Sequence, residues 1–80
     1  MNLIQMIADW SRLPNGNRRA RLTKRIWDVM STEGYQIDHN GDLVRNRRCV
    51  VFGVLSLGTA EVFNAVLADQ QRKVVFYESY

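Results

Sequence analysis

Cysteine, proline and histidine each occur only once among the 80 residues of this chain. A single cysteine cannot form an intramolecular disulfide or complete a cysteine-rich zinc site, so the fold must depend on packing alone, and a reducing, cytoplasmic location is expected. Long hydrophobic runs are also lacking: the longest, residues 49–57, contains Gly53 and Ser56 and is too short to span a membrane. The apolar N-terminus has no cationic leader and no cleavage pattern. We therefore expect no membrane partner and interpret residues 1–10 as part of the folded protein.

Length and composition indicate one ordinary globular domain. A chain this short buries only about 60% of its unfolded surface and cannot form two separate cores. Hydrophobic residues make up 46% of the chain and charged residues 24%, which is far from the composition of disordered proteins. We expect a single domain over residues 1–80, with no internal repeat or linker.

Two amphipathic helices are predicted in the first half of the chain. The first covers residues 2–13, with Asn2 and Gln5 as its capping pair, and residues 14–16 form a turn after it. The second runs over residues 17–33 and ends at Gly34, a favourable C-cap. The expected buried stripes are Leu3, Met6, Ile7, Trp10 and Leu13 in the first helix and Leu22, Ile26, Val29 and Met30 in the second.

Strands are predicted after Gly34, where the hydrophobic period changes to two. Asn40 and Gly41 favour a two-residue type I′ hairpin loop, which would place Ile37 opposite Val44 and Gln36 opposite Arg45. Residues 46–48 form a second, basic turn. Residues 49–55 then read as a strand that is apolar on both faces and lies in the middle of a sheet.

A third helix is predicted to begin at Gly58 and Thr59, to bury Val62, Phe63, Val66 and Leu67, and to end near Gln71, before a last strand over residues 74–77. The expected order is therefore helix, helix, three strands, helix, strand. It predicts an α+β fold in which three helices pack on a four-stranded mixed sheet, closed by a right-handed crossover. Because two strands are apolar on both faces, either the helices cover both faces or a second copy covers one in a homodimer.

Each candidate motif for catalysis, metal binding or cofactor binding lacks a residue that the chemistry requires. His39 lies beside Asp38 and Asp42 but has no nucleophile paired with it. The calcium-loop spacing that begins at Asp38 fails because Leu43 and Cys49 stand where the loop requires glycine and glutamate. Residues 53–59 join a strand to a helix without the lysine of a phosphate-binding loop. Cys49 is interpreted as a small core residue. We expect a protein that is not an enzyme and has no cofactor.

Positive charge is the most informative feature. Between Trp10 and Asp28 lie six cationic side chains and no acidic one, and the formal net charge is +3. Cations in the first turns of a helix oppose its macrodipole, and such a locally unfavourable choice is expected at functional sites. Arginine outnumbers lysine nine to two, and its planar guanidinium suits bidentate phosphate contacts. The candidate nucleic-acid-binding residues form a helix cluster (Arg18, Arg19, Arg21, Lys24 and Arg25) and a hairpin cluster (Arg45, Arg47 and Arg48).

The leading hypothesis is a small protein that binds DNA or RNA through these two clusters, which would act together if the hairpin folds back beside the second helix. The short turn between the first two helices is like that of a helix-turn-helix, with the cations at the start of the second helix. The alternative is an interaction module, an inhibitor or adaptor of the kind that phages encode. Such a module would dock its basic face on an acidic or nucleic-acid-binding protein.

Overall fold

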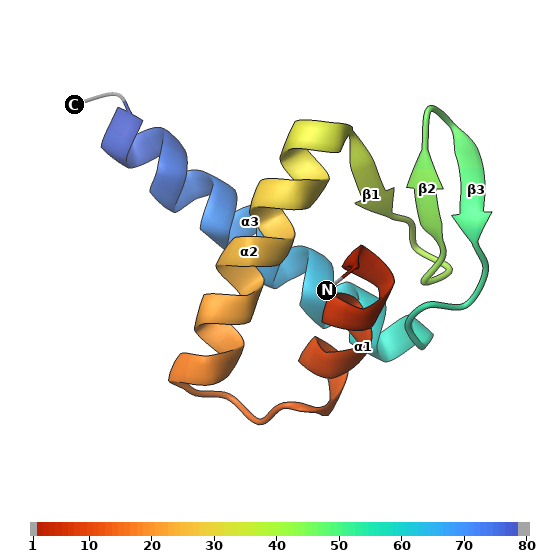
Figure 1. Cartoon of the computed structure of the whole chain (residues 1–80), viewed down its shortest axis with the longest axis horizontal. Coiled ribbons are helices and arrows are strands. Elements are labelled where there is room, and N and C mark those ends of the chain that lie inside the picture. Colours follow the sequence, from red (N-terminus) through yellow and green to blue (C-terminus); the bar gives the residue numbers. More distant parts are fainter. Residues whose placement is uncertain (1, 79–80) are drawn as a thin grey trace.

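A computed structural model describes the backbone of residues 2–78 and the side chains of residues 2–74. Three helices and three strands follow one another along the chain (Figure 1). The strands form one antiparallel sheet in the order β1-β2-β3, so the fold belongs to the α+β class, as predicted. None of the helices in the described part of the chain is long and apolar enough to cross a membrane. The elements are α1 (Leu3–Arg12), α2 (Asn17–Glu33), β1 (Tyr35–Ile37), β2 (Leu43–Arg45), β3 (Arg48–Val51) and α3 (Leu57–Glu78).

The first two helices form where the sequence predicts them. The side chain of Asn2 caps α1 by accepting a hydrogen bond of 2.8 Å from the main-chain N–H of Gln5. The predicted bounds of α2 are confirmed, and Gly34 ends the helix in the left-handed conformation, with φ at +76°. Only residues 13–16 separate the two helices, so α1 and α2 pack against each other (Figure 1).

The core lies where the three helices and the sheet meet, with Trp10 of α1 at its centre. Its indole ring meets Phe63 of α3 edge-to-face, with ring centroids 5.0 Å apart. The indole N–H donates a hydrogen bond of 2.8 Å to the hydroxyl of Thr23, which in turn donates to the carbonyl of Arg19. This satisfies the polar atom of a fully buried aromatic side chain. The buried apolar residues are Met6, Ile7, Trp10, Ile26, Met30, Ile37, Leu43, Leu55, Ala60 and Phe63.

The predicted fourth strand is wrong, and with it the four-stranded mixed sheet. Residues 74–77 belong to the last turns of α3, which continues to Glu78 instead of ending near Gln71. A run of four apolar residues fits a strand or a helix equally well by its periodicity. No glycine or proline occurs after Gly58, so nothing in the sequence interrupts the helix. Without this strand there is no parallel crossover.

The predicted central strand is in fact a short strand at the edge of the sheet. β3 ends at Val51, and residues 48–50 are exposed, Cys49 among them. The pairing with β2 shifts by one residue between Leu43 and Val44, which leaves Val50 as a bulge. Phe52, which follows the strand, is 80% exposed. The expectation of a sheet buried on both faces, which motivated the homodimer, therefore loses its basis.

The hairpin between β1 and β2 exists, but its register is one residue away from the prediction. Ile37 pairs with Leu43 and Gln36 with Val44. The main-chain N–H of Asp38 donates to the carbonyl of Asp42, so the loop that this pair closes contains three residues, 39–41, rather than two. The carboxylate of Asp38 accepts hydrogen bonds from the main-chain N–H groups of Asn40 and Asp42, which fixes a type I turn with Gly41 left-handed after it.

The type I′ turn predicted at Asn40 and Gly41 occurs instead between β2 and β3. Asn46 and Arg47 form this two-residue turn and both have positive φ, at 55° and 64°. Arginine has no intrinsic preference for this conformation, so the turn holds Arg47 at a cost of about 1 kcal/mol.

Candidate nucleic-acid interface

An open groove of about 540 Å³ runs between the C-terminal half of α1 and the N-terminal half of α2. The α2 side of this groove arises from helix geometry, because residues spaced by three and four lie on one stripe of a helix. Apolar side chains contribute part of the lining, as half-buried leucines from both walls. The residues of this α1–α2 groove are Asp9, Arg12, Leu13, Arg18, Arg21, Leu22 and Arg25.

Three of the four groove arginines lack an acidic partner. Among the described side chains, the salt bridges are those of Arg12 with Asp9 and of Arg72 and Lys73 with Asp69, so none involves Arg18, Arg21 or Arg25. Hydrogen bonds from Gln5 and Arg12 lower the pKa of Asp9, which stays ionised at neutral pH. The groove therefore contains four positive charges and one negative charge.

The start of α2 adds to this positive potential. Gly16 occupies the N-cap position and cannot provide a side-chain cap, and the first turn contains no acidic residue. The first N–H groups of a helix carry a partial positive charge that attracts anions. Arg18 lies in this same turn, so the helix terminus and the side-chain charges have the same sign. The repulsion predicted from the sequence is thus present without a compensating carboxylate in the first turn of α2.

Arg19 has a structural role that the sequence analysis did not predict. Its guanidinium carbon lies 3.7 Å from the centroid of the Trp10 ring, and one terminal nitrogen donates a hydrogen bond of 3.0 Å to the side chain of Asn15. Its Nε is buried, with no hydrogen-bond partner among the described residues. Arg19 therefore packs over the core and does not line the groove. Lys24 is exposed on α2 but does not line the groove.

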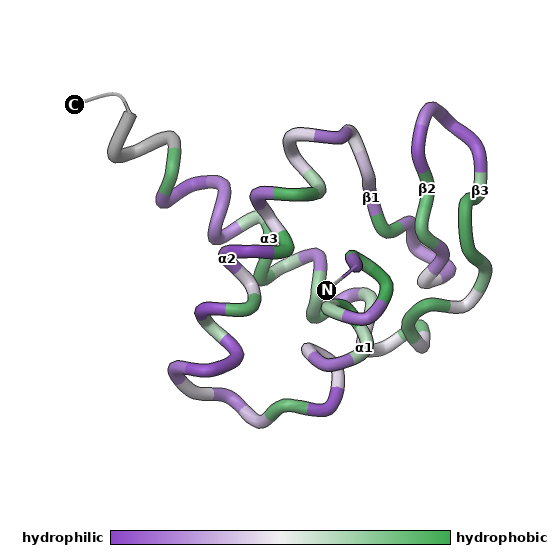
Figure 2. Tube along the Cα trace, viewed as in Figure 1, coloured by the Kyte–Doolittle hydropathy of each residue, from purple (hydrophilic) through white to green (hydrophobic). Residues whose placement is uncertain are grey.

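The hairpin cluster does not join the helix cluster. The turn between β2 and β3 lies at the upper right of Figure 1, whereas the start of α2 lies at the lower left. Figure 2 shows both regions as separate hydrophilic segments. Arg45 packs over Tyr35, 5.0 Å from the ring centroid, whereas Arg47 and Arg48 are exposed. The eight predicted cations therefore do not form one surface, and three of them, Arg18, Arg21 and Arg25, line the groove.

Arg12 is the groove residue that the sequence analysis left out of its candidates. It lies before Pro14 on a different helix, so only the packing of α1 against α2 brings it to the other three. A signal was available, because Arg12 belongs to the same acid-free segment as the helix cluster.

The acidic residues near His39 have structural partners. Asp38 fixes the hairpin loop, and the carboxylate of Asp42 accepts a hydrogen bond of 2.7 Å from the N–H of Gly53. The described residues contain no group of three side chains placed to hold a metal ion. Partial desolvation, with smaller contributions from Asp42 and Asp38, raises the pKa of the Cys49 thiol, so this exposed cysteine is protonated at neutral pH.

No protein-family model, curated protein or solved structure matches this chain.

Proposed function

We propose that this protein binds the sugar–phosphate backbone of a nucleic acid in the α1–α2 groove. The observation that carries the proposal is the concentration of four arginines from two helices in one groove, three of which have no acidic partner among the described side chains. At these three arginines, binding a phosphate does not require an existing ion pair to break. The planar guanidinium group also donates two parallel hydrogen bonds to a phosphate, which lysine cannot do.

The arrangement of α1 and α2 supports the same function by analogy. In helix-turn-helix proteins a short turn joins two helices, and the N-terminal part of the second helix approaches the nucleic acid. Here residues 13–16 form the short turn, and Arg18 and Arg21 lie at the start of the second helix. The uncapped end of α2 would add main-chain N–H donors to the arginine contacts.

The direct test is a fluorescence polarisation titration of labelled duplex and single-stranded oligonucleotides at low salt. We compare the wild-type protein with a groove variant that carries Arg18→Gln, Arg21→Gln and Arg25→Gln. Glutamine has a good helix propensity, so α2 should remain folded. The wild-type protein should bind with a micromolar Kd and the groove variant at least about ten-fold more weakly.

The chain provides a matched control. A hairpin variant with Arg45→Gln, Arg47→Gln and Arg48→Gln loses the same three charges, so each variant lowers the formal net charge from +3 to zero. A weakening confined to the groove variant identifies the groove as the binding surface. Equal weakening in both variants would show that only the overall charge matters and would contradict the proposal.

A second candidate function is favoured by the apolar part of the groove lining. Leu13 and Leu22 lie among the arginines, and an acidic amphipathic helix would contact both kinds of residue. Pull-down from nuclease-treated lysate with the wild-type protein and both variants separates the two functions. A purified partner that binds only when the groove arginines are intact, while oligonucleotides fail to bind, would favour this second function.

A further inference from the structure

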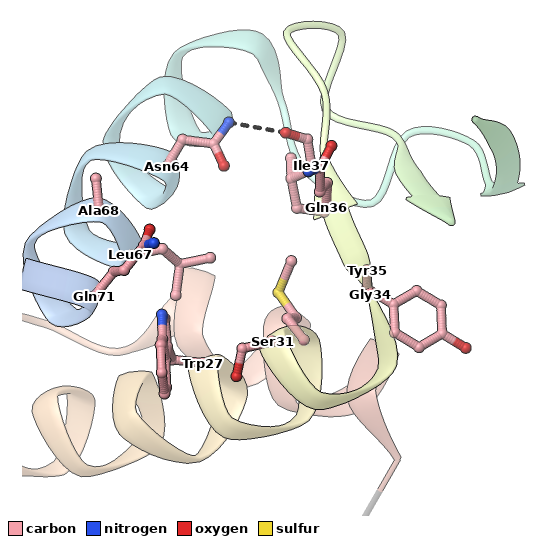
Figure 3. Close-up of a pocket in the computed structure, with 11 residues that line it drawn as sticks. Trp27, Ser31, Gly34, Tyr35, Gln36, Ile37, Asn64, Leu67, Ala68 and Gln71 are labelled. Atoms are coloured by element: carbon pink, nitrogen blue, oxygen red, sulfur yellow. Dashed lines mark hydrogen bonds between the residues drawn. The ribbon is translucent and has the colours of Figure 1, made fainter. Parts of the chain in front are cut away.

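A second cavity, of about 440 Å³, lies on the other side of α2, where this helix faces β1 and α3 (Figure 3). Its volume falls within the range of small-molecule pockets, about 300–1,000 Å³. Figure 3 shows its walls, with Trp27 and Ser31 from α2, Gln36 and Ile37 from β1, and Asn64, Leu67 and Gln71 from α3. We call this cavity the α2–α3 pocket.

Among the described side chains, none that lines the α2–α3 pocket is charged, although charged residues make up 24% of the protein. In place of charges the lining contains an indole ring, side-chain amides, a hydroxyl and aliphatic groups. Side chains of this kind bind flat, neutral molecules: the aromatic ring offers a stacking surface, and amides offer a donor and an acceptor side by side.

Two polar groups of the pocket, on Trp27 and Gln71, differ from those of the core because they have no hydrogen-bond partner among the described residues. The indole N–H of the core residue Trp10 donates to Thr23, but the hydrogen bonds among residues 2–74 include none from the indole N–H of Trp27. The same holds for the side-chain amide of Gln71. These groups are therefore available to a ligand.

Asn64 is already held in one orientation. Its Nδ2 donates a hydrogen bond of 3.0 Å to the carbonyl of Ile37, at the edge of β1 that does not pair with β2 (Figure 3). This leaves Oδ1 as a fixed acceptor. A side chain that is oriented before the ligand arrives loses little conformational entropy on binding.

We propose that the α2–α3 pocket binds an unpaired nucleobase, stacked on Trp27 and hydrogen-bonded along its edge by Gln71 and Asn64. Nucleobases are flat and neutral and carry donors and acceptors on one edge, and asparagine and glutamine are their common amide partners. The inference rests on the proposed function and deepens it, because a base in the pocket requires a single-stranded ligand.

The outer surface of α2 connects the pocket to the groove. At 100° per residue, Arg21 and then Lys24 lie between the stripe of Arg25 and the stripe of Trp27. Lys24 is exposed, so it is placed to contact the phosphate next to a bound base. Asp28 is exposed on the same surface and reduces the positive potential there. This arrangement gives a role to Lys24, which does not line the groove.

The test uses a single-stranded oligonucleotide and an abasic oligonucleotide with the same number of phosphates. Intrinsic tryptophan fluorescence reports on stacking, because Trp27 is half-buried whereas Trp10 is enclosed in the core. The wild-type protein should bind the base-containing oligonucleotide at least about five-fold more tightly, with quenching that the abasic strand does not cause.

Variants identify the pocket as the source of this preference. Trp27→Leu and Gln71→Ala should remove the preference while binding of the abasic strand is unchanged, and Trp27→Phe should retain most of it because phenylalanine also stacks. Gln70→Ala is the matched control, because Gln70 is the neighbour of Gln71 on α3 but does not line the pocket. Gln71 is exposed, so its substitution is not expected to unfold the protein.

The outcomes separate this inference from the proposed function. Equal binding of both strands without quenching would overturn the nucleobase site and leave the groove as the binding surface. If neither strand binds, the proposed function fails, and a titration with free adenosine and cytidine then decides about the pocket alone. Quenching by a nucleoside that is lost in Gln71→Ala would support the site, and an unchanged spectrum at millimolar nucleoside would overturn it.

Discussion

The salt dependence of binding should differ between the groove variant and the hairpin variant by a predictable amount. Each arginine–phosphate contact on duplex DNA contributes about −0.9 to the slope of log affinity against log salt. If the four groove arginines each contact one phosphate, the wild-type slope is about −3.6. Affinity should then fall about 150-fold between about 50 and 200 mM salt.

Loss of Arg18, Arg21 and Arg25 leaves Arg12 as the only groove arginine. The groove variant should then have a slope of about −0.9, and its affinity should fall only about 3.5-fold over the same range of salt. The hairpin variant should keep the wild-type slope, because its three arginines lie at a different end of the molecule. The assay is fluorescence polarisation at four or more salt concentrations. Slopes that fall equally in both variants would refute the reasoning.

Four further predictions concern the fold. Gly41→Ala should lower the free energy of unfolding in urea by about 3 kcal/mol or more, because the added Cβ would lie 2.0 Å from the main-chain oxygen of Leu55. Gly53→Ala is the control: Gly53 also has a positive φ but lies in open space, so the loss should be only about 1 kcal/mol. Equal losses in the two variants would contradict the clash. Thr23→Val should cost about 1–3 kcal/mol, because it leaves the buried indole N–H without an acceptor; an unchanged unfolding midpoint would argue against this hydrogen bond. Arg47→Gly should raise the melting temperature by about 4–8 °C, because glycine relieves a strain of about 1 kcal/mol at this positive φ. A melting temperature below that of the wild type would show that the turn is not strained. Alkylation of Cys49 by iodoacetamide should be slow at neutral pH, because the pKa of its thiol is raised. The alkylation rate should reach half its maximum at a higher pH than the rate for free cysteine does. A lower midpoint pH would contradict the partial desolvation of this thiol.

The helices were predictable where the sequence marks their ends. Gly16 and Gly34 bracket α2, and Asn2 caps α1, so local chemistry alone determines these bounds. The C-terminal half of α3 was not predictable from periodicity, since residues 74–77 are uniformly apolar and fit either period. The absence of a helix breaker after Gly58 was the better signal.

The hairpin was predictable but its register was not. The presence of Asn40 and Gly41 indicates a turn, but the carboxylate of Asp38 decides that the loop contains three residues. Two turn types compete for the same dipeptide, and a side-chain hydrogen bond selects one of them. The change of one residue places Leu43 instead of Val44 opposite Ile37, and both of these paired residues are buried.

The candidate site was predictable in part. Helical spacing alone places Arg18, Arg21 and Arg25 on one stripe, and these three residues line the groove. The same spacing places Arg19 on the side of Thr23 and Ile26, so its position over Trp10 could have been expected. Whether the two clusters lie side by side depends on tertiary structure, which the sequence pattern does not determine. The antiparallel sheet places the hairpin turn away from the start of α2.

The most direct test of the nucleic-acid groove is an NMR titration of the isotope-labelled protein with a short abasic oligonucleotide, which offers phosphates but no bases. Shifts of the main-chain amide signals report which residues lie near the ligand. We predict the largest shifts at Arg12 and along residues 16–25, with small ones at residues 45–48. The largest shifts at the turn between β2 and β3, or no shifts at low salt, would contradict the account.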